Sequence, residues 1–492
     1  GPCLSNLQKR TKQLLHVFMI FLLLLLLHGS QASTHVWPLP VKSTKTDETT
    51  PTRLLSTSFT IDAVGLSSSA LEAATTRYLN LLQPKRQSTN HYQQQQHNHA
   101  TSSSSSPLVY LHVNITGSAA PYVFGDDESY SLHWTKGASA AGLKSTTLVG
   151  ALRGLETFAQ LVEPDPVYRS IPLKIPDVLF TLEDSPRYPY RGLMMDLSRH
   201  YYPITFIEKQ IDIMAANKLN VLHLHLTDDQ SFPIASTTHP ELAASGAFSR
   251  PTSSGSVSYV YTQDDLTSLE RYAALRGVVL LPEIDMPAHT SSWGASHPEL
   301  MVTGATEGCS PSLFQHGDTL NPIENGTYQL IDDLLKEVAN KMFPNSPFLH
   351  LGGDEVPTAC WAGNKTITKW MLAHGITSGD YDELESYFVH RVSQGVGLQS
   401  TNRTLVYWEE IFNNNVTLNK NVIIQAWKSN AMSGIIRAGH RTTNSYKWYL
   451  NHGCNNYGDG LWGDFYINDP MQWANTTNPL EGKRIFLNCF SS

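Results

Sequence analysis

The sequence predicts an α/β fold in which a TIM-type (β/α)8 barrel follows a small α+β domain. Apolar segments of strand length recur from residue 190 onward, and amphipathic helical stretches separate most of them. Most of these segments are almost wholly apolar, which is typical of parallel strands buried on both faces. Acidic residues follow five of them, at the strand ends where a barrel enzyme carries its active site.

The chain begins with a segment typical of a cleavable secretory signal peptide, predicted over residues 1–33. Basic residues between positions 9 and 12 precede an apolar run from Leu14 to Leu27, and small and polar residues follow at 29–33. A membrane anchor is the alternative, but the run is shorter than the ~20 apolar residues that a spanning helix needs. We therefore expect a protein of the secretory pathway, lysosomal or extracellular, without a stable membrane anchor.

Residues 34–185 are predicted to form the α+β domain. One helix fits 71–82, an alternating strand fits 108–113, and a second helix fits 147–162. Residues 87–107 are rich in Gln, His and Ser, which is typical of a flexible, solvated loop.

The barrel is predicted over residues 186–492. Its strands are expected at 192–197, 221–227, 278–284, 348–352, 404–408, 422–426, 441–445 and 484–487, and its clearest helices at 205–217, 264–276, 328–342 and 381–394. A doubly wound open sheet is the main alternative. It is disfavoured because no Gly-rich phosphate-binding turn follows the first strand.

Composition argues against several other classes of protein. The chain has 492 residues, of which 41% are apolar, so it can bury a large core and is not disordered. The formal charge of −8 is spread along the chain without a basic block, which argues against a nucleic-acid partner. The cysteines lack zinc-type spacing, so we expect neither a metal nor an organic cofactor.

The most specific chemical signal lies in Phe348–Glu355, where a predicted strand runs into Gly352 and Gly353 and then into Asp354 and Glu355. Neighbouring residues of a strand point to opposite faces. Both carboxylates therefore reach one site only if the chain leaves the strand, which two glycines permit. Taken alone, the pair is equally consistent with a solvated acidic turn.

Five motifs of the chain resemble glycoside hydrolase family twenty, the β-N-acetylhexosaminidases. They occur in the family's order at 191–200 (RGLMMDLSRH), 222–233 (LHLHLTDDQSFP), 281–289 (LPEIDMPAH), 350–355 (HLGGDE) and 406–410 (VYWEE). The resemblance begins near residue 35 and is nearest to eukaryotic lysosomal and extracellular members. It implies an exo-acting enzyme that releases terminal non-reducing N-acetylglucosamine or N-acetylgalactosamine.

The resemblance also implies a retaining mechanism in which the substrate assists. The acetamido oxygen of the sugar attacks the anomeric carbon and forms an oxazolinium ion. Glu355 would protonate the leaving oxygen and then activate water, Asp354 would accept the acetamido N–H, and Tyr449 would donate to the acetamido oxygen. A glycosidase with a conventional carboxylate nucleophile is the second enzyme hypothesis.

Further residues match substrate-binding positions of the family. Arg199 would bind ring hydroxyls through its guanidinium group, although a surface ion pair is its alternative role. Asp228 and His289 would support the acid/base, and Trp408 and Trp427 would wall the acetamido pocket. The expected partners are glycans, namely N-glycans, glycolipids or chitin oligosaccharides. Relatives are often dimers, so a homodimer is also expected.

Two departures from the family stand out. Asn451 occupies a position where many relatives carry Asp, and the lost negative charge leads us to expect tolerance of anionic sugars. After Asn488 the family continues into a pocket-closing Trp-x-Glu segment and a final helix, whereas this chain stops at Ser492. We therefore expect a barrel that lacks its last helix and is destabilised by the apolar surface left uncovered. A catalytically impaired glycan-binding relative is the functional alternative.

Cysteines and glycosylation signals complete the secretory pattern. The resemblance pairs Cys309 with Cys360 in a disulfide that would brace the active-site loop, while the pairing of Cys454 and Cys489 stays open. Six Asn-X-Ser/Thr signals fit a glycosylated protein, and they begin at Asn114, Asn325, Asn364, Asn402, Asn415 and Asn475.

Overall fold

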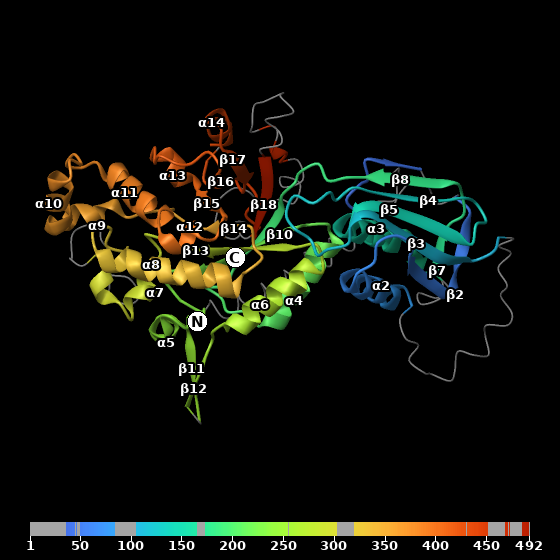
Figure 1. The fold of residues 1–492 in the computed structure, drawn as a ribbon, viewed down its shortest axis with the longest axis horizontal. Coiled ribbons are helices and arrows are strands. Elements are labelled where there is room, and N and C mark those ends of the chain that lie inside the picture. Colours follow the sequence, from blue (N-terminus) through green and yellow to red (C-terminus); the bar gives the residue numbers. More distant parts are fainter. Residues whose placement is uncertain are drawn as a thin grey trace, which may run out of the picture.

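The computed structural model describes residues 36–44, 46, 50–83, 105–164, 173–253, 255–302, 319–429, 431–450, 468–470, 472 and 485–491. Within them, an eight-stranded sheet with two helices lies beside a closed barrel (Figure 1). The predicted signal peptide and nearly all of the predicted loop 87–107 lie outside the described residues. Among the helices that are described, none combines the length and hydropathy needed to cross a membrane.

The first body is an eight-stranded sheet in the order β1-β8-β4-β5-β3-β2-β7-β6. Its strands are β1 (Lys42–Ser43), β2 (Thr52–Ala63), β3 (Leu108–Ser118), β4 (Tyr130–Trp134), β5 (Ala140–Thr147), β6 (Glu163–Pro164), β7 (Leu173–Pro176) and β8 (Phe180–Asp184). Helices α2 (Ser69–Leu82) and α3 (Leu148–Leu161) pack against it. Helix α3 begins where the Thr147 hydroxyl accepts the N–H of Gly150, which is a standard N-cap. The predicted helices and the strand at 108 are confirmed.

The second body is a barrel of parallel strands, which confirms the predicted fold class. Its strands are β9 (Arg191–Asp196), β10 (Val221–Thr227), β13 (Val279–Ile284), β14 (Phe348–His350), β15 (Thr404–Trp408), β16 (Ile423–Ala426), β17 (Arg441–Asn444) and β18 (Ile485–Ser491). Strand β9 pairs with both β10 and β18, so the sheet closes on itself. A doubly wound open sheet is therefore excluded.

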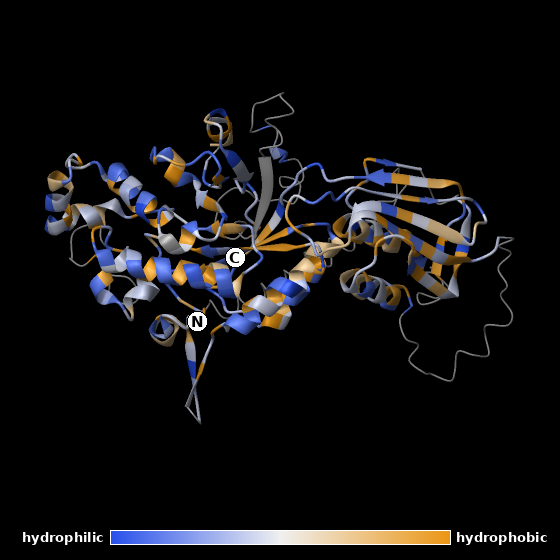
Figure 2. Cartoon of the chain, in the orientation of Figure 1, coloured by the Kyte–Doolittle hydropathy of each residue, from blue (hydrophilic) through white to orange (hydrophobic). Residues whose placement is uncertain are grey.

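Helices follow the barrel strands and cover the outside of the barrel (Figure 1). They are α4 (Ile204–Ala216), α5 (Pro240–Gly246), α6 (Gln263–Ala274), α7 (Ser291–Gly294), α8 (Asn325–Glu337), α9 (Thr358–Gly363), α10 (Lys365–Ala373), α11 (Tyr381–Ser393), α12 (Val396–Gln399), α13 (Glu409–Asn413) and α14 (Met432–Arg437). Short elements complete the set: the 3-10 turn η1 (Pro298–Leu300), the π-turn η2 (Val338–Met342) and the hairpin β11 (Ser249–Thr252) and β12 (Gly255–Ser258). Apolar residues concentrate on the barrel strands, and the helices are amphipathic (Figure 2).

A buried polar network joins the sheet to the barrel at the amino ends of the strands. Glu128 accepts a hydrogen bond from Arg153 Nε at 2.8 Å and another from Arg191 Nη2, at the start of β9. Arg153 Nη2 also donates to the carbonyl of Gly277 at 2.7 Å, just before β13. Because this end of the barrel is covered, the opposite end, where the strands terminate, is left for a site.

Candidate active site

Polar side chains gather at the carboxyl ends of the barrel strands. Asp196 is the last residue of β9, Asp228 follows β10, Asp285 follows β13, and Glu409 follows β15. All four side chains are buried. Carboxyl ends of neighbouring parallel strands meet at one rim, and in barrels this rim carries the chemistry.

The chain leaves β14 through two glycines in left-handed conformations. Gly352 has φ +68° and Gly353 has φ +92°, so the strand ends at His350, two residues earlier than predicted. A Cβ atom on Gly352 would lie 1.6 Å from Oδ1 of Asp285, which only glycine avoids. The glycines thus bring the backbone against the end of β13.

Asp354 and Glu355 leave this turn with different exposure. The Asp354 side chain is 15% exposed, whereas that of Glu355, at φ +51°, is 48% exposed. Both face one imidazole: Nε2 of His289 lies 3.7 Å from Oδ2 of Asp354 and 3.6 Å from Oε2 of Glu355. The predicted pair therefore meets at one site rather than pointing apart.

His289 follows β13 and also has a left-handed backbone, at φ +58°. Its Nδ1 lies 3.4 Å from Oδ1 of Asp228. Burial lowers the pKa of His289, but the charge of Asp354 and the hydrogen bond and charge of Asp228 outweigh burial and raise it well above the ordinary value. His289 is therefore a cation placed between acidic groups.

A chain of alternating charges continues from Asp228 into the barrel. His225 donates from Nε2 to Oδ2 of Asp228 at 2.8 Å and from Nδ1 to Oε2 of Glu283 at 2.7 Å. Burial alone would lower the pKa of His225, but the carboxylate of Glu283 raises it well above the ordinary value. The opposite holds for Glu283, where burial would raise the pKa and the nearby histidines, His225 foremost, lower it well below the ordinary value.

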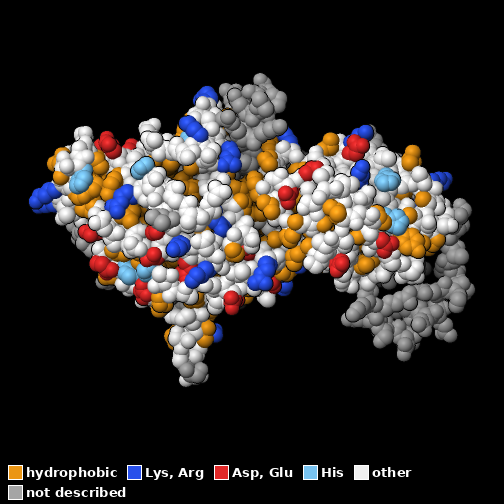
Figure 3. All heavy atoms as spheres, viewed as in Figure 1, with side chains coloured by type: hydrophobic (Ala, Val, Ile, Leu, Met, Phe, Trp, Pro, Cys, Tyr) orange, Lys and Arg blue, Asp and Glu red, His pale blue; other side chains and the backbone are white. Residues whose placement is uncertain are grey.

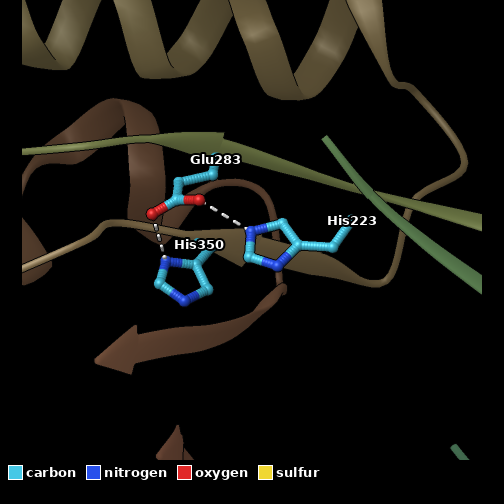
Figure 4. Close-up of side chains that lie close together, drawn as sticks. All are labelled: His223, Glu283 and His350. Atoms are coloured by element: carbon cyan, nitrogen blue, oxygen red, sulfur yellow. Dashed lines mark hydrogen bonds and ion pairs between the residues drawn. The ribbon is translucent and has the colours of Figure 1, made fainter. Parts of the chain in front are cut away.

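Glu283 is the centre of the barrel's polar interior, shown in Figure 4 with His223 and His350. His223 Nε2 lies 2.8 Å from Oε2 of Glu283, and the indole N–H of Trp408 donates to Oε1 at 2.8 Å. His223, Glu283 and His350 are close enough to hold a metal ion. However, the Nδ1 lone pair of His350 accepts the N–H of Gly352 at 3.0 Å. We therefore interpret this group as a hydrogen-bonded core.

Asp285 and Asp354 form a buried carboxyl pair. Burial and the charge of Asp354 raise the pKa of Asp285 well above its ordinary value. Burial also raises the pKa of Asp354, whereas the His289 cation and a hydrogen bond with Asp285 lower it. Two adjacent buried carboxyls hold one proton between them. We place this proton on Asp285, which leaves Asp354 ionised and able to accept a hydrogen bond.

Arg199 is held at the rim by acidic neighbours. Its Nη1 lies 2.9 Å from Oδ2 of Asp196, its Nη2 lies 2.5 Å from Oδ2 of Asp228, and its Nε donates to Oε1 of Gln230 at 2.8 Å. The guanidinium is therefore held at the rim by two ion pairs and a hydrogen bond, with 36% of the side chain exposed, and its role in binding sugar hydroxyls stays a prediction.

Aromatic side chains form one wall of the site. The rings of Trp408 and Trp427 lie 6.1 Å apart at 65°, and those of Trp427 and Tyr449 lie 6.0 Å apart. The indole N–H of Trp427 donates to Oε2 of Glu410 at 2.9 Å. Burial raises the pKa of Glu410 to about 7 and that of Tyr449 well above its ordinary value.

The structure adds Glu283 to the site and shows the contact made by Glu410, one of the acidic residues expected to follow a strand. Glu283 anchors Trp408 and the interior histidines, and Glu410 orients Trp427. A charged residue inside the otherwise apolar strand β13 was the sequence signal for Glu283. Glu410 had a weaker signal, as the second of two acids after β15.

Other predicted residues lie at the surface or outside the described part. Asn451, Cys309, Cys454 and Asn475 lie outside the described residues, as does the side chain of Cys489. Cys360 is disulfide-bonded, and its pairing with Cys309 stays a prediction. The remaining glycosylation signals are at least partly exposed, at Asn114, Asn325, Asn364, Asn402 and Asn415.

The chain is similar to several named proteins. It is 36% identical over 375 residues to beta-hexosaminidase subunit beta of Rattus norvegicus, covering 74% of this chain and 64% of that protein. It is 37% identical over 354 residues to the Homo sapiens subunit beta, covering 71% of this chain and 59% of that protein. The chain thus spans less than two thirds of the length of these relatives.

Solved structures share the fold. Flavobacterium johnsoniae chitobiase superimposes with a TM-score of 0.73 at 27% identity, over 93% of this chain and 65% of that one. The exo beta-N-acetylglucosaminidase of Vibrio harveyi gives a TM-score of 0.74 at 24% identity, over 94% of this chain and 70% of that one. Residues 36–161 match the family described as "beta-acetyl hexosaminidase like", and residues 188–479 match "Glycosyl hydrolase family 20, catalytic domain". The chain therefore belongs to glycosyl hydrolase family 20.

Proposed function

We propose that this protein is an exo-acting β-N-acetylhexosaminidase that works by substrate-assisted, retaining hydrolysis. The observation that carries the proposal is the adjacent pair Asp354 and Glu355, whose carboxylates lie 3.7 and 3.6 Å from Nε2 of His289. The indole walls of Trp408 and Trp427 stand at the same rim. Family membership supports the same activity, which the relatives' names also carry.

Asp354 and Glu355 would have different catalytic roles because their carboxylates differ in exposure to solvent. The Asp354 side chain is only 15% exposed. With the shared proton on Asp285, Asp354 would be ionised and would accept a hydrogen bond from the acetamido N–H of the sugar. Tyr449 keeps its proton because burial raises its pKa, so its phenol would donate to the acetamido oxygen. These two contacts would hold the oxygen against the anomeric carbon and stabilise the charge of the oxazolinium ion.

Glu355 would serve as the acid and then the base. Its more exposed carboxyl can reach both the leaving oxygen and an incoming water. The His289 cation beside it is itself held by Asp228. Arg199 would bind ring hydroxyls, because its fixed guanidinium presents several N–H donors in one plane.

We also propose a glycan substrate class and passage through the secretory pathway. We include those N-glycans, glycolipids and chitin oligosaccharides that have the N-acetylated sugar at their non-reducing end. The disulfide-bonded Cys360 supports an oxidising compartment. The relatives are named as subunits, which supports assembly with a second chain, and we propose a homodimer. Glycosylation at the surface signals and the sugar-hydroxyl role of Asn451 are part of the same proposal.

The test is hydrolysis of a chromogenic N-acetyl-β-glucosaminide by the purified chain, compared with the matching β-glucoside that lacks the acetamide. We expect turnover of the first only, because the amide oxygen performs the first attack. Glu355→Gln should lower kcat about 10²–10⁴-fold. A thiazoline that mimics the cyclic intermediate should inhibit competitively. Equal cleavage of both substrates, or indifference to the thiazoline, would indicate a carboxylate nucleophile instead.

A further inference from the structure

The chain contains the same four residues, His-Pro-Glu-Leu, twice: at 239–242 and at 297–300. In both copies the histidine precedes a helical turn that begins with the proline, at α5 and at η1. In both copies histidine Nδ1 lies close to the glutamate two residues later, at 3.1 Å for Glu241 and 3.0 Å for Glu299. The repeat therefore has one local geometry in two places.

The two copies face each other on the outside of the barrel. The rings of His239 and His297 are 6.2 Å apart at 81°. Oε1 of Glu241 lies between them, 3.1 Å from Nδ1 of His239 and 3.0 Å from Nε2 of His297. Ligand atoms of these three residues all lie within 4.8 Å of one another. Histidine and acidic side chains are seen together on the surface over α5 and α8 (Figure 3).

Each imidazole also has a carboxylate at its other nitrogen. Nε2 of His239 lies 3.7 Å from Oδ2 of Asp333 on α8, and Nδ1 of His297 lies 3.0 Å from Oε1 of Glu299. A neutral imidazole has one N–H and one lone pair, so it can donate to only one of two flanking carboxylates. Its lone pair would then face an anion. Protonation of each ring would resolve this conflict, as it does for His225, and so would a single metal cation held between the two rings.

We propose that His239 Nδ1, His297 Nε2 and a carboxylate oxygen of Glu241 bind a zinc-class divalent metal ion, with water as a fourth ligand. Two nitrogens and one oxygen are a donor set that zinc accepts. Bonds of about 2.0–2.1 Å at tetrahedral angles separate ligand atoms by roughly 3.3 Å. The separations of 3.0 and 3.1 Å therefore need to expand only slightly.

The outer carboxylates fit the same assignment. With the inner nitrogens on the metal, the outer N–H groups would donate to Asp333 and Glu299, an arrangement that orients metal-binding histidines and raises their basicity. The five residues carry three carboxylates and two imidazoles, so the charge of a dication is more than offset locally. The histidine side chains are 19% and 20% exposed, so they are largely ordered by packing, while Glu241 is 41% exposed and leaves access for the ion and for water.

The metal would join two loops that carry site residues. His239 ends the loop that follows β10 and contains Asp228, and His297 ends the segment after β13 that contains His289 and the short helix α7. Those loops already meet where Ser291 donates its hydroxyl to Oδ1 of Asp229 at 2.8 Å. The metal site would be a second connection between these two segments, on the outside of the barrel. It does not depend on the proposed hydrolase activity.

The test is equilibrium dialysis of the full chain against Zn²⁺, with bound metal measured by elemental analysis. His91, His97 and His99 are replaced by Gln in the parent protein, because the His-rich stretch at 87–107 would add background. We expect one zinc per chain and a melting temperature that rises with Zn²⁺ and falls again with chelator. Co²⁺ should give the visible absorption bands of a tetrahedral site.

Variants locate the metal. His297→Gln should lower zinc affinity at least ten-fold, and Glu299→Gln about ten-fold, as expected for a residue that orients a ligand. His390→Gln, an exposed histidine on α11, should leave binding unchanged. Each variant should melt at the parent's temperature in chelator, which shows that it folds. No saturable binding, or equal binding by parent and His297→Gln, would overturn the proposal.

Discussion

Replacement of Gly352 by Ala tests whether the turn after β14 is what assembles the site. Gly352 has φ +68°, and an added Cβ would lie 1.6 Å from Oδ1, 2.4 Å from Cγ and 2.8 Å from Cα of Asp285. A rotamer change moves the carboxylate but not the Cα atom. The backbone of one strand end must therefore shift, and Asp285 must leave its place beside Asp354.

The cost can be worked out from two contributions. An alanine in the left-handed backbone conformation lowers the free energy of unfolding by about 1–2 kcal/mol at any position. Displacing Asp285 also breaks its hydrogen bond from the N–H of Gly353, 3.2 Å long and buried. Leaving that N–H without an acceptor costs about 1–3 kcal/mol. We expect a total of about 2–5 kcal/mol, together with loss of hydrolysis, because the acceptor Asp354 loses its partner.

Gly137→Ala is the matched control. Gly137 has nearly the same backbone, φ +71°, but nothing lies within 4 Å of an added Cβ. It should show the backbone strain alone and keep full activity. The assays are the melting temperature and the rate on a chromogenic N-acetylglucosaminide. If both alanine variants lose the same stability and the same activity, the close approach at Gly352 is not what positions the pair.

Two further predictions concern buried groups. Burial raises the pKa of Glu385 to about 7, so its stabilising proton is present at low pH and lost as the pH rises through 7. Glu385→Gln keeps the hydrogen bond from Asn414, 2.8 Å long, and should match the parent's melting temperature at pH 5 but exceed it at pH 8. The same dependence of melting temperature on pH in the parent and in Glu385→Gln would contradict this prediction. Trp408→Phe replaces the buried indole by a smaller ring and removes the N–H that donates to Glu283, so the free energy of unfolding should fall by at least about 1–3 kcal/mol. An unchanged melting temperature would contradict that assignment.

The barrel was predictable because its strands are apolar runs that end at turns. The predicted strand 221–227 coincides with β10 and 404–408 with β15, since both runs are bounded by polar residues. The helix predicted over 328–342 instead divides into α8 and the π-turn η2 at Val338. Apolar periodicity does not distinguish these two hydrogen-bond patterns. The last strand was predicted to end at 487, whereas backbone pairing with β9 carries it to Ser491.

The site was predictable only in part. The local sequence was enough to predict Asp354 and Glu355 as site residues, because two glycines followed by two acidic residues are typical of a turn that presents both carboxylates. The contact of His225 with Glu283 joins residues on different strands, and it depends on the register in which these two residues are paired across β10 and β13. Sequence spacing does not contain that register. The resemblance to the family predicted Arg199 as a site residue. Its ion pairs with Asp196 and Asp228 could be seen only in the closed barrel.

The unequal exposure of Asp354 and Glu355 supports the different roles proposed for their two carboxylates. The glycine turn directs Asp354 toward Asp285, where burial limits competition by water for an amide N–H. Glu355, with a left-handed backbone, has its side chain 48% exposed, and there the proposed acid would exchange its proton with water after each turnover. His289, held from behind by Asp228, contacts both. With the two environments exchanged, the proposed acceptor would face solvent and the proposed acid would be buried without a route for its proton, so the proposal requires the order Asp-Glu after Gly-Gly.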